Sequence, residues 1–136
     1  MKIVTRLSEQ NYKYICHSLA QKKIPYISLS YFKEDYQEQR VYILEECGKP
    51  VAMCSLVWSD KHKNFAIKRL ICFRKRNAGR GYAGFLISHI PLPKDASICC
   101  TPWADNLSMR HLLEKNGFLF KYMFSEYWCF YEKLTK

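Results

Sequence analysis

The sequence lacks the cysteine spacing of metal sites and disulfide frameworks. Its seven cysteines are an odd number and include no CxxC pair. Two of them, Cys99 and Cys100, are adjacent on a strand-like run, which would point their side chains in opposite directions. Structural zinc and a set of disulfides are therefore both disfavoured, and we expect no bound metal.

Long apolar runs are also absent. No run approaches the roughly 18 residues that a membrane span requires, and Met1–Leu7 lacks the apolar stretch of a signal peptide. We therefore expect a cytoplasmic protein without a membrane partner. The 136 residues suit one core, which predicts a single domain over residues 1–136. A composition of 49% hydrophobic and 25% charged residues argues against disorder.

Acidic residues are missing from the middle of the chain. From Lys61 to Lys94 nine residues are basic and none is acidic, whereas the segments before and after carry net charges of +1 and 0. The nine are Lys61, Lys63, Lys68, Arg69, Arg74, Lys75, Arg76, Arg80 and Lys94. Such a segment attracts an anion. A nucleic acid, an anionic membrane surface, a polyphosphate cofactor and a plain solvated face all fit it, and charge alone does not choose among them.

The N-terminal part predicts a strand and two helices. Lys2–Leu7 has the composition of a strand, and Ser8 offers an N-cap for a helix that ends near Lys22. A short second helix is expected from Ser30, as its cap, through Tyr36. Its exposed side would carry three acids, namely Glu34, Asp35 and Glu38.

The middle of the chain predicts three strands joined by tight turns, which must therefore be antiparallel. They are Val41–Cys47, Val51–Trp58 and Phe65–Phe73, with a turn at Gly48-Lys49-Pro50. The expected elements that follow are a helix over residues 81–90, a strand at Ile98–Thr101, a helix from Asn106 to Asn116 ended by Gly117, and two closing strands within Phe118–Lys133.

Glycine is scarce, and its few positions are clustered. The chain has only five glycines, yet Gly79, Gly81 and Gly84 fall within six residues. The segment from Ala78 to Ala83 joins the end of a strand to the start of a helix, where N–H groups lack intrahelical partners and the helix dipole is positive. A diphosphate suits this position, since glycine lets its oxygens approach the amides. A flexible loop is the plain alternative.

The same glycines spell GxGxxG, the fingerprint of a dinucleotide site. That site follows the first strand of a parallel sheet, whereas three antiparallel strands precede these glycines and only 52 residues follow Gly84. No Gly-Lys-Ser/Thr follows either, so the phosphate loop of the nucleoside triphosphatases is absent.

At these residues the sequence resembles the GNAT superfamily of acetyl-coenzyme A dependent N-acyltransferases, whose cofactor motif is Gln/Arg-x-x-Gly-x-Gly/Ala at the start of a helix. One register begins at Arg76 and keeps the basic residue. The other runs from Ala78 to Ala83 and places Leu86 and Ile87 on the apolar positions of the helix. We favour the second register, in which Ala78 stands where the family has Gln or Arg.

A second segment supports the resemblance. The helix and turn from Asn106 to Phe118 are similar to the family's Asn...Tyr-x-Lys-x-Gly-Phe motif, matched here by Asn106, Lys115, Gly117 and Phe118. The order of elements over residues 1–136 is also similar. The resemblance implies an α/β (α+β) fold with a mixed, mostly antiparallel central sheet of about six or seven strands and about four flanking helices.

The resemblance further implies acetyl-CoA as co-substrate, bound in a cleft where the Phe65–Phe73 strand splays from Ile98–Thr101. The backbone N–H of Ile71 would polarise the thioester carbonyl and stabilise the oxyanion that forms there. The implied cofactor-binding positions are Ile71, Cys72, Phe73, Ala78, Gly79, Arg80, Gly81, Tyr82, Ala83 and Asn106. The side chains implied to reach the phosphates are Arg74, Lys75, Arg76 and Arg80.

The catalytic acid and base are not evident from the sequence. The family often has a tyrosine on its last helix that protonates the departing thiolate, and Leu113 stands at that position. Candidates for a replacement acid are Cys100, Tyr122, Tyr127 and Tyr131, with core packing or protonation by water as alternatives. Candidates for a base are Glu34, Asp35, Glu45 and Glu46, and each equally suits a solvated surface.

Three functions are consistent with these residues. The first is an N-acetyltransferase that transfers acetyl directly to a primary amine of a small molecule or peptide. The second is a CoA-binding or regulatory module that has lost turnover. The third is an acetyltransferase directed to RNA such as an aminoacyl-tRNA, which the basic segment would bind. We expect a monomer or homodimer.

Overall fold

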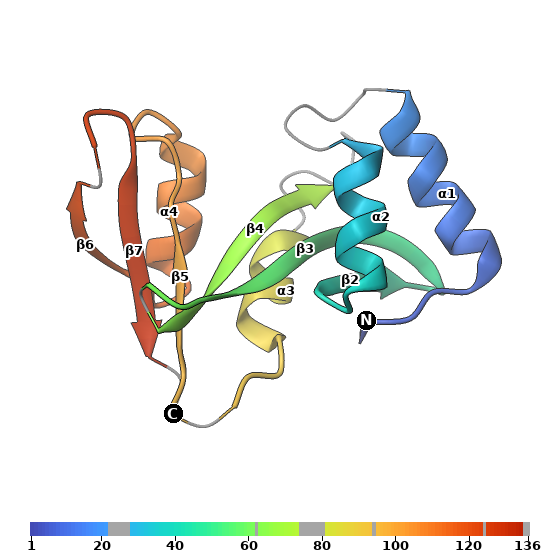
Figure 1. Ribbon diagram of the computed structural model, residues 1–136, viewed down its shortest axis with the longest axis horizontal. Coiled ribbons are helices and arrows are strands. Elements are labelled where there is room, and N and C mark those ends of the chain that lie inside the picture. The colour runs from blue at the N-terminus through green and yellow to red at the C-terminus, as the bar shows by residue number, and fades with distance from the viewer. Residues whose placement is uncertain (22–27, 62, 74–80, 94, 124, 135–136) are drawn as a thin grey trace. The chain divides into compact units, whose positions relative to one another are not determined.

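The computed structural model describes residues 1–21, 28–61, 63–73, 81–93, 95–123 and 125–134 (Figure 1). Within these residues there are four helices and seven strands. The helices are α1 (Glu9–Ala20), α2 (Leu29–Gln37), α3 (Tyr82–His89) and α4 (Leu107–Lys115). The strands are β1 (Lys2–Val4), β2 (Val41–Glu46), β3 (Lys49–Ser59), β4 (Asn64–Cys72), β5 (Ser97–Cys100), β6 (Leu119–Met123) and β7 (Cys129–Leu134).

All seven strands belong to one sheet with the order β1-β2-β3-β4-β5-β7-β6. The pairs β1–β2, β2–β3, β5–β7 and β6–β7 are antiparallel, and β4–β5 is parallel. This confirms the predicted mixed, mostly antiparallel sheet with four helices. By contacts the chain divides into two compact units. The N-terminal unit comprises Met1–Leu56 and Arg69–Ile90, and the C-terminal unit comprises Val57–Lys68 and Pro91–Lys136. The single domain over residues 1–136 stays a prediction.

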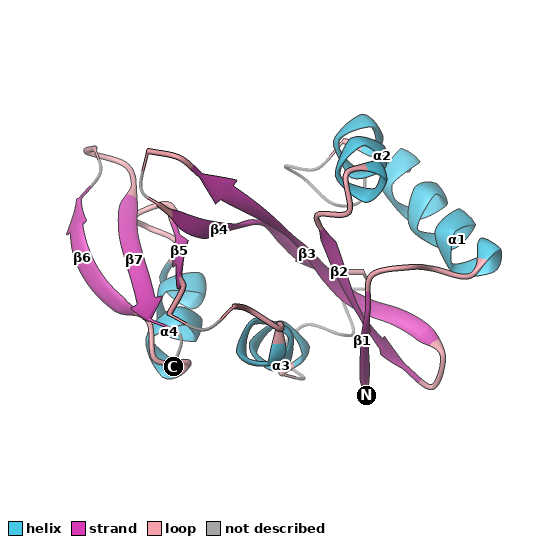
Figure 2. Ribbon diagram, turned by 60° about the horizontal axis from the view of Figure 1, so that its bottom comes forward, coloured by secondary structure: helices cyan, strands magenta, loops and turns pink. Residues whose placement is uncertain are grey.

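In the N-terminal unit, α1 and α2 cover one side of β1–β3 and α3 lies on the other (Figure 2). The helix α1 begins as predicted, because the Ser8 hydroxyl accepts a hydrogen bond from the Asn11 amide at 3.1 Å. The core between the two helices and the strands is formed by Ile15, Leu19, Phe32, Val41, Ile43, Met53 and Phe73.

The second helix differs from its prediction in its first residue. The cap of α2 is Ser28, whose hydroxyl accepts from the Tyr31 amide at 3.2 Å, and Ser30 lies in the first turn instead. Either serine is chemically suitable as a cap. Ser28 is the cap because its backbone is extended, with φ −95° and ψ 155°, as an N-cap requires.

The hairpin between β2 and β3 is confirmed, with its turn one residue earlier than predicted. The turn residues are Cys47 and Gly48, both with positive φ (54° and 76°), as a two-residue turn matched to the strand twist needs. Pro50 belongs to β3 and lies opposite Glu45, where the register shifts. A register shift tolerates the missing N–H of proline.

In the C-terminal unit, β7 lies between β5 and β6, and α4 packs against this group of strands (Figure 1). The end of α4 follows the predicted glycine signal, since Gly117 has φ +88°. The Gly117 amide donates to the Glu114 carbonyl and the Phe118 amide to the Leu113 carbonyl, which is the Schellman pattern. Among the described helices none is long and apolar enough to cross a membrane.

Candidate functional site

The end of β4 carries the three backbone positions implied for the cofactor. Ile71 packs partly buried against the core under α1 and α2, and Phe73 belongs to that core. The Phe73 amide donates to the Val51 carbonyl at 3.1 Å. Because this donor is engaged within the sheet, it does not serve a ligand at the same time. Hydrogen-bonding directions alternate along a strand, so the Cys72 amide points away from β3.

The start of α3 is built on a glycine with an unusual backbone. Gly81 is the N-cap of α3 and has φ +80°, a left-handed conformation that glycine adopts at no steric cost. Among the described residues, no group lies within 4 Å of a Cβ placed there, so these residues leave the space beside Gly81 open. The Gly81 carbonyl accepts the first turn's hydrogen bond from the Phe85 amide at 2.9 Å.

The caps of the four helices differ. Side-chain oxygens cap α1, α2 and α4, from Ser8, Ser28 and Asn106, whereas Gly81 has no side chain with which to cap α3. The first-turn amides of a helix are donors at the positive end of its dipole. The start of α3 therefore combines open space with N–H donors, which is the arrangement that binds a phosphate.

Cys72 links the end of β4 to the start of α3. Burial raises the pKa of the Cys72 thiol, and a hydrogen bond from the backbone of Ala83 lowers it by less. The implied cofactor residues Ile71, Cys72, Phe73, Gly81, Tyr82 and Ala83 all belong to the N-terminal unit.

Part of the implied site lies outside the described residues. This holds for Ala78, Gly79 and Arg80 of the glycine segment and for the basic residues Arg74, Lys75 and Arg76. The role of Asn106 stays a prediction, and its side-chain oxygen caps α4 by accepting from the Met109 amide at 3.2 Å. The cleft expected between β4 and β5 also stays a prediction. The ladder between these strands joins Phe65 to Ile98 and Ala66 to Cys99.

The candidates for a catalytic acid lie in the C-terminal unit. Leu113 is fully buried on α4, so its position serves packing. The Tyr131 hydroxyl donates to Glu114 Oε1 at 3.0 Å and accepts from Arg110 Nε at 3.1 Å. Burial raises the pKa of Tyr131, and burial raises the pKa of Cys100 to about 12. Tyr122 and Tyr127 are 45% and 61% exposed.

A pocket of about 310 Å³ lies within the C-terminal unit. It is close to the smallest size of small-molecule sites. Its walls come from the end of β3, the first half of β4, the end of β5 and β7. The residues that line it are Val57, Trp58, Ser59, Ala66, Ile67, Lys68, Cys99, Cys100, Thr101 and Phe130.

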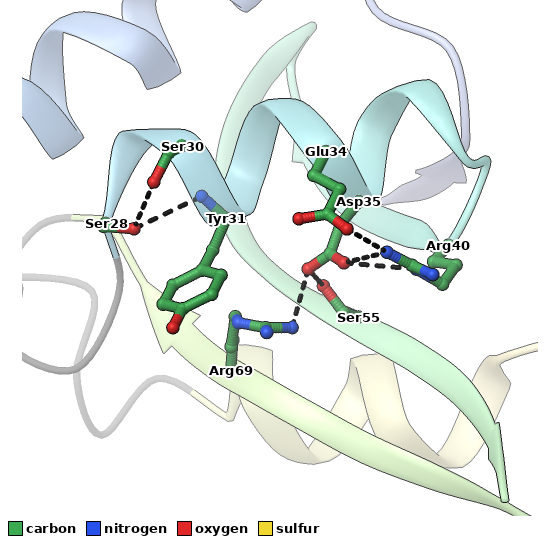
Figure 3. A network of polar contacts seen from close by, with 8 residues as sticks. All are labelled: Ser28, Ser30, Tyr31, Glu34, Asp35, Arg40, Ser55 and Arg69. Carbon is green, nitrogen blue, oxygen red and sulfur yellow. Dashed lines mark hydrogen bonds and ion pairs between the residues drawn. The ribbon is translucent and has the colours of Figure 1, made fainter.

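The acid predicted to lie on the exposed side of α2 is buried instead. Only 3% of the Asp35 side chain is exposed, and both carboxylate oxygens accept hydrogen bonds (Figure 3). Arg40 donates to Oδ1 from Nε at 3.2 Å and from Nη2 at 3.0 Å, while Ser55 and Arg69 donate to Oδ2 at 2.7 Å each. The prediction was wrong because two of the three partners, Ser55 and Arg69, come from β3 and β4, which helical periodicity does not register.

This cluster removes Asp35 from the candidate bases, because its oxygens are already occupied by three donor residues. Of the other candidates, Glu34 is exposed and lies 3.8 Å from Arg40. Glu45 accepts from Asn11 Nδ2 at 2.9 Å, and Glu46 is partly buried. The described residues contain no group of three or more His, Cys, Asp or Glu side chains that could hold a metal ion.

Many solved structures share the fold of this chain. A GNAT-family acetyltransferase from Bacillus cereus superposes with a TM-score of 0.79 at 16% identity, covering 99% of this chain and 97% of that one. The chain has the fold of the GNAT acetyltransferases. Ard1 of Thermoplasma volcanium shares this GNAT fold with a TM-score of 0.73 at 11% identity, covering 99% and 97% of the two chains.

Another GNAT-fold structure contains the cofactor. Spermidine N-acetyltransferase from Vibrio cholerae, solved in complex with CoA and spermine, superposes with a TM-score of 0.70 at 17% identity, covering 98% of this chain and 95% of that one. No protein-family model and no curated protein sequence matches this chain. The described residues fit the diphosphate of coenzyme A, because the uncapped start of α3 offers N–H donors and Gly81 carries no side chain that would fill the space beside them.

Proposed function

We propose that this protein is an acetyl-CoA dependent N-acetyltransferase that transfers acetyl directly to a primary amine. The observation that carries the proposal is the start of α3 within a GNAT fold. There Gly81 takes a left-handed conformation at the N-cap of α3, and the described residues leave the space beside it open. A helix start of this kind favours an anion.

Bound acetyl-CoA would supply an activated acetyl thioester. The first-turn amides of α3 would hold its diphosphate, with Gly81 leaving room for the oxygens. The backbone of β4 from Ile71 onward would line the pantetheine, and an N–H from this stretch would polarise the thioester carbonyl. Such a donor contributes about 3–4 kcal/mol in enzymes where it has been removed. The resemblance implies Ile71 for this donor. The alternation along β4 favours the Cys72 amide instead, because the Ile71 amide points toward β3 as the Phe73 amide does, and the Cys72 amide points away from it.

The acceptor class follows from the chemistry of direct transfer. A primary amine must lose a proton before it attacks, so a base or a water relay is needed. A similar structure is named for spermidine, a small polyamine, and was solved with spermine. We therefore propose a small-molecule or peptide amine as acceptor, with protonation of the thiolate by water, since Leu113 carries no acidic hydrogen.

A second function is favoured by one observation. Leu113 is 0% exposed, so the position where the family often has its tyrosine is part of a packed core. A chain that binds CoA without turnover would carry such a residue. This alternative is a CoA-binding or regulatory module.

The experiment combines binding with turnover. Titration calorimetry with acetyl-CoA, NAD and ATP should show binding of acetyl-CoA alone. Thiol release is then measured with a panel of polyamines, amino acids and peptides with free N-termini. Binding with thiol release supports the enzyme, and binding without release by any amine supports the module. Absence of acetyl-CoA binding contradicts both.

A further inference from the structure

The strand β4 contains a residue in a conformation that strands do not use. Arg69 has φ +53°, inside Asn64–Cys72 and just two residues before Ile71. A left-handed backbone is uncommon for a residue with a side chain, because its Cβ crowds the following carbonyl oxygen. Such a residue persists only where its surroundings hold it in place.

The side chain of Arg69 is held by two residues of α2 (Figure 3). Its Nη1 donates to Asp35 Oδ2 at 2.7 Å, and its guanidinium lies 4.7 Å from the centre of the Tyr31 ring. Tyr31 and Asp35 are four residues apart and so lie on one face of the helix. Both contacts fall within the N-terminal unit.

The carboxylate that holds Arg69 is itself fixed. Ser55 on β3 donates to the same oxygen of Asp35 at 2.7 Å, and Arg40 occupies the other oxygen. The Arg40 amide also donates to the Asp35 carbonyl at 2.9 Å. Because Asp35 is tied to β3 and to the segment after α2, it offers Arg69 an immobile anchor.

We propose that Asp35 and Tyr31 position Arg69, and that Arg69 in turn sets the direction of the β4 backbone from Leu70 to Phe73. This proposal rests on the proposed function, in which that backbone presents its amide donors to the acetyl thioester and pantetheine. Arg69 is thereby a positioning residue. Its positive charge, which in the sequence belongs to the acid-free segment, is paired with the buried Asp35 carboxylate and so does not face an external anion.

At position 69 we expect glycine to be better tolerated than alanine, which is the reverse of the usual order in a strand. At an ordinary strand position alanine is better tolerated than glycine. Where the backbone must be left-handed the order reverses, since glycine adopts this region without strain and alanine does not. Arg69→Gly therefore keeps the β4 backbone accessible after the anchor is lost, while Arg69→Ala releases it to an extended conformation.

The test compares Arg69→Ala, Arg69→Gly and Arg40→Ala in the full chain. Arg40→Ala is the matched control, because it removes a guanidinium from the same carboxylate, while Ser55 and the backbone amide of residue 40 still hold Asp35 and β4 is unchanged. Two readouts are taken, the backbone amide chemical shifts of Leu70, Ile71 and Cys72, and the Kd for acetyl-CoA by titration calorimetry. Arg69→Ala should move all three shifts and weaken acetyl-CoA binding about tenfold. Arg69→Gly and Arg40→Ala should stay within about threefold of the wild type.

The chemical shifts keep the inference testable apart from the proposed function. Unchanged amide shifts in folded Arg69→Ala overturn it, whatever the binding data show. Equal losses of affinity in Arg69→Ala and Arg40→Ala also overturn it, since they indicate a general loss of stability. A wild type that binds no acetyl-CoA contradicts the proposed function, while shifts that move in Arg69→Ala alone still support the positioning of β4 by Arg69.

Discussion

Two polar regions of the N-terminal unit are built in opposite ways. Around Asp35 the polar groups close on each other, because one buried carboxylate receives donors from Arg40, Ser55 and Arg69. At the start of α3 the first-turn amides have no side-chain cap, and among the described residues no group lies within 4 Å of a Cβ placed on Gly81. The first region satisfies its polar groups internally, and the second leaves room for a partner from outside.

This difference separates stability from binding. Burying a charge is costly unless it is paired, so a closed cluster such as that of Asp35 matters mainly to the folded state. A helix start without a side-chain cap gains no capping energy for the fold, and glycine there costs conformational entropy. We infer that the closed region maintains the geometry of β4 and that the open region binds the ligand.

The largest effect on stability is expected when the polar cluster around Asp35 is disrupted. Asp35→Ala leaves Arg40 and Arg69 without their carboxylate and should lower the free energy of unfolding by about 3 kcal/mol. Urea unfolding of the variant and the wild type measures this difference in free energy. Glu34→Ala is the control, because Glu34 is 67% exposed at its side chain and lies 3.8 Å from the same Arg40. It should change stability by less than about 0.5 kcal/mol. Equal losses of stability in Asp35→Ala and Glu34→Ala would show that the burial of Asp35 adds nothing to the stability of the fold.

The next effect is a loss of acetyl-CoA affinity when a charged side chain is placed at Gly81. Gly81→Asp introduces a carboxylate that repels phosphate and competes for the amides at the start of α3, so the Kd for acetyl-CoA should rise about 100-fold. Aspartate tolerates left-handed backbone better than most residues. Titration calorimetry provides the measurement.

Gly48→Asp is the matched control for this substitution. Gly48 has φ +76° against +80° at Gly81, and a Cβ at either position meets nothing within 4 Å. Both variants should therefore lose similar stability, and Gly48→Asp should bind acetyl-CoA like the wild type. Equal binding by both variants would mean that Gly81 does not lie at the cofactor.

A smaller effect sharpens the comparison between helix starts. Ser8→Ala removes the side-chain cap of α1 and should cost about 1 kcal/mol of stability, measured by urea unfolding. It should leave the Kd for acetyl-CoA unchanged, because the cap of α1 is a closed arrangement. A loss of affinity in Ser8→Ala at full folding would contradict the division between closed and open helix starts.

The smallest effect concerns a closed group of the C-terminal unit. Burial raises the pKa of the Cys100 thiol from 9.0 to about 12. The folded protein therefore holds this proton above pH 9 while the unfolded chain releases it, and the stabilisation present below pH 9 is lost as the pH rises toward 12. By pH 9 the loss is about 0.4 kcal/mol.

Urea unfolding at pH 7 and pH 9 detects this change. Cys100→Ala should reduce the pH dependence, whereas Cys47→Ala, at an exposed thiol, should leave it as in the wild type. A pH dependence in Cys100→Ala as large as that of the wild type would assign the effect to other groups.

Much of the fold could be predicted because its signals are local. Ser8 was predicted as the cap of α1, a helix was predicted from Asn106, and Gly117 was predicted to end it, from residues within about four positions of each helix end. The hairpin at Gly48 followed from its turn residues. The glycine segment pointed to the start of α3, where the structure then placed Gly81 with positive φ.

Other features could not be predicted because their causes lie far along the chain. Asp35 has the same helical spacing as an exposed residue, and only partners 20 and 34 residues away, Ser55 and Arg69, explain its burial. The choice of Ser28 over Ser30 as the cap depended on the backbone conformation before α2. Nothing in the residues around Arg69 signals a left-handed backbone.

The sequence by itself determined the start of α1 and the end of α4, which segments are strands, and that an acid-free basic segment surrounds a glycine-rich helix start. These properties depend on hydrogen bonds and steric limits within a few residues. Only the tertiary structure decided that β7 lies between β5 and β6, that Asp35 is buried, and that Arg69 is held in a strained conformation before Ile71. The physical reason is that burial and charge pairing are decided by residues that meet only when the chain has folded.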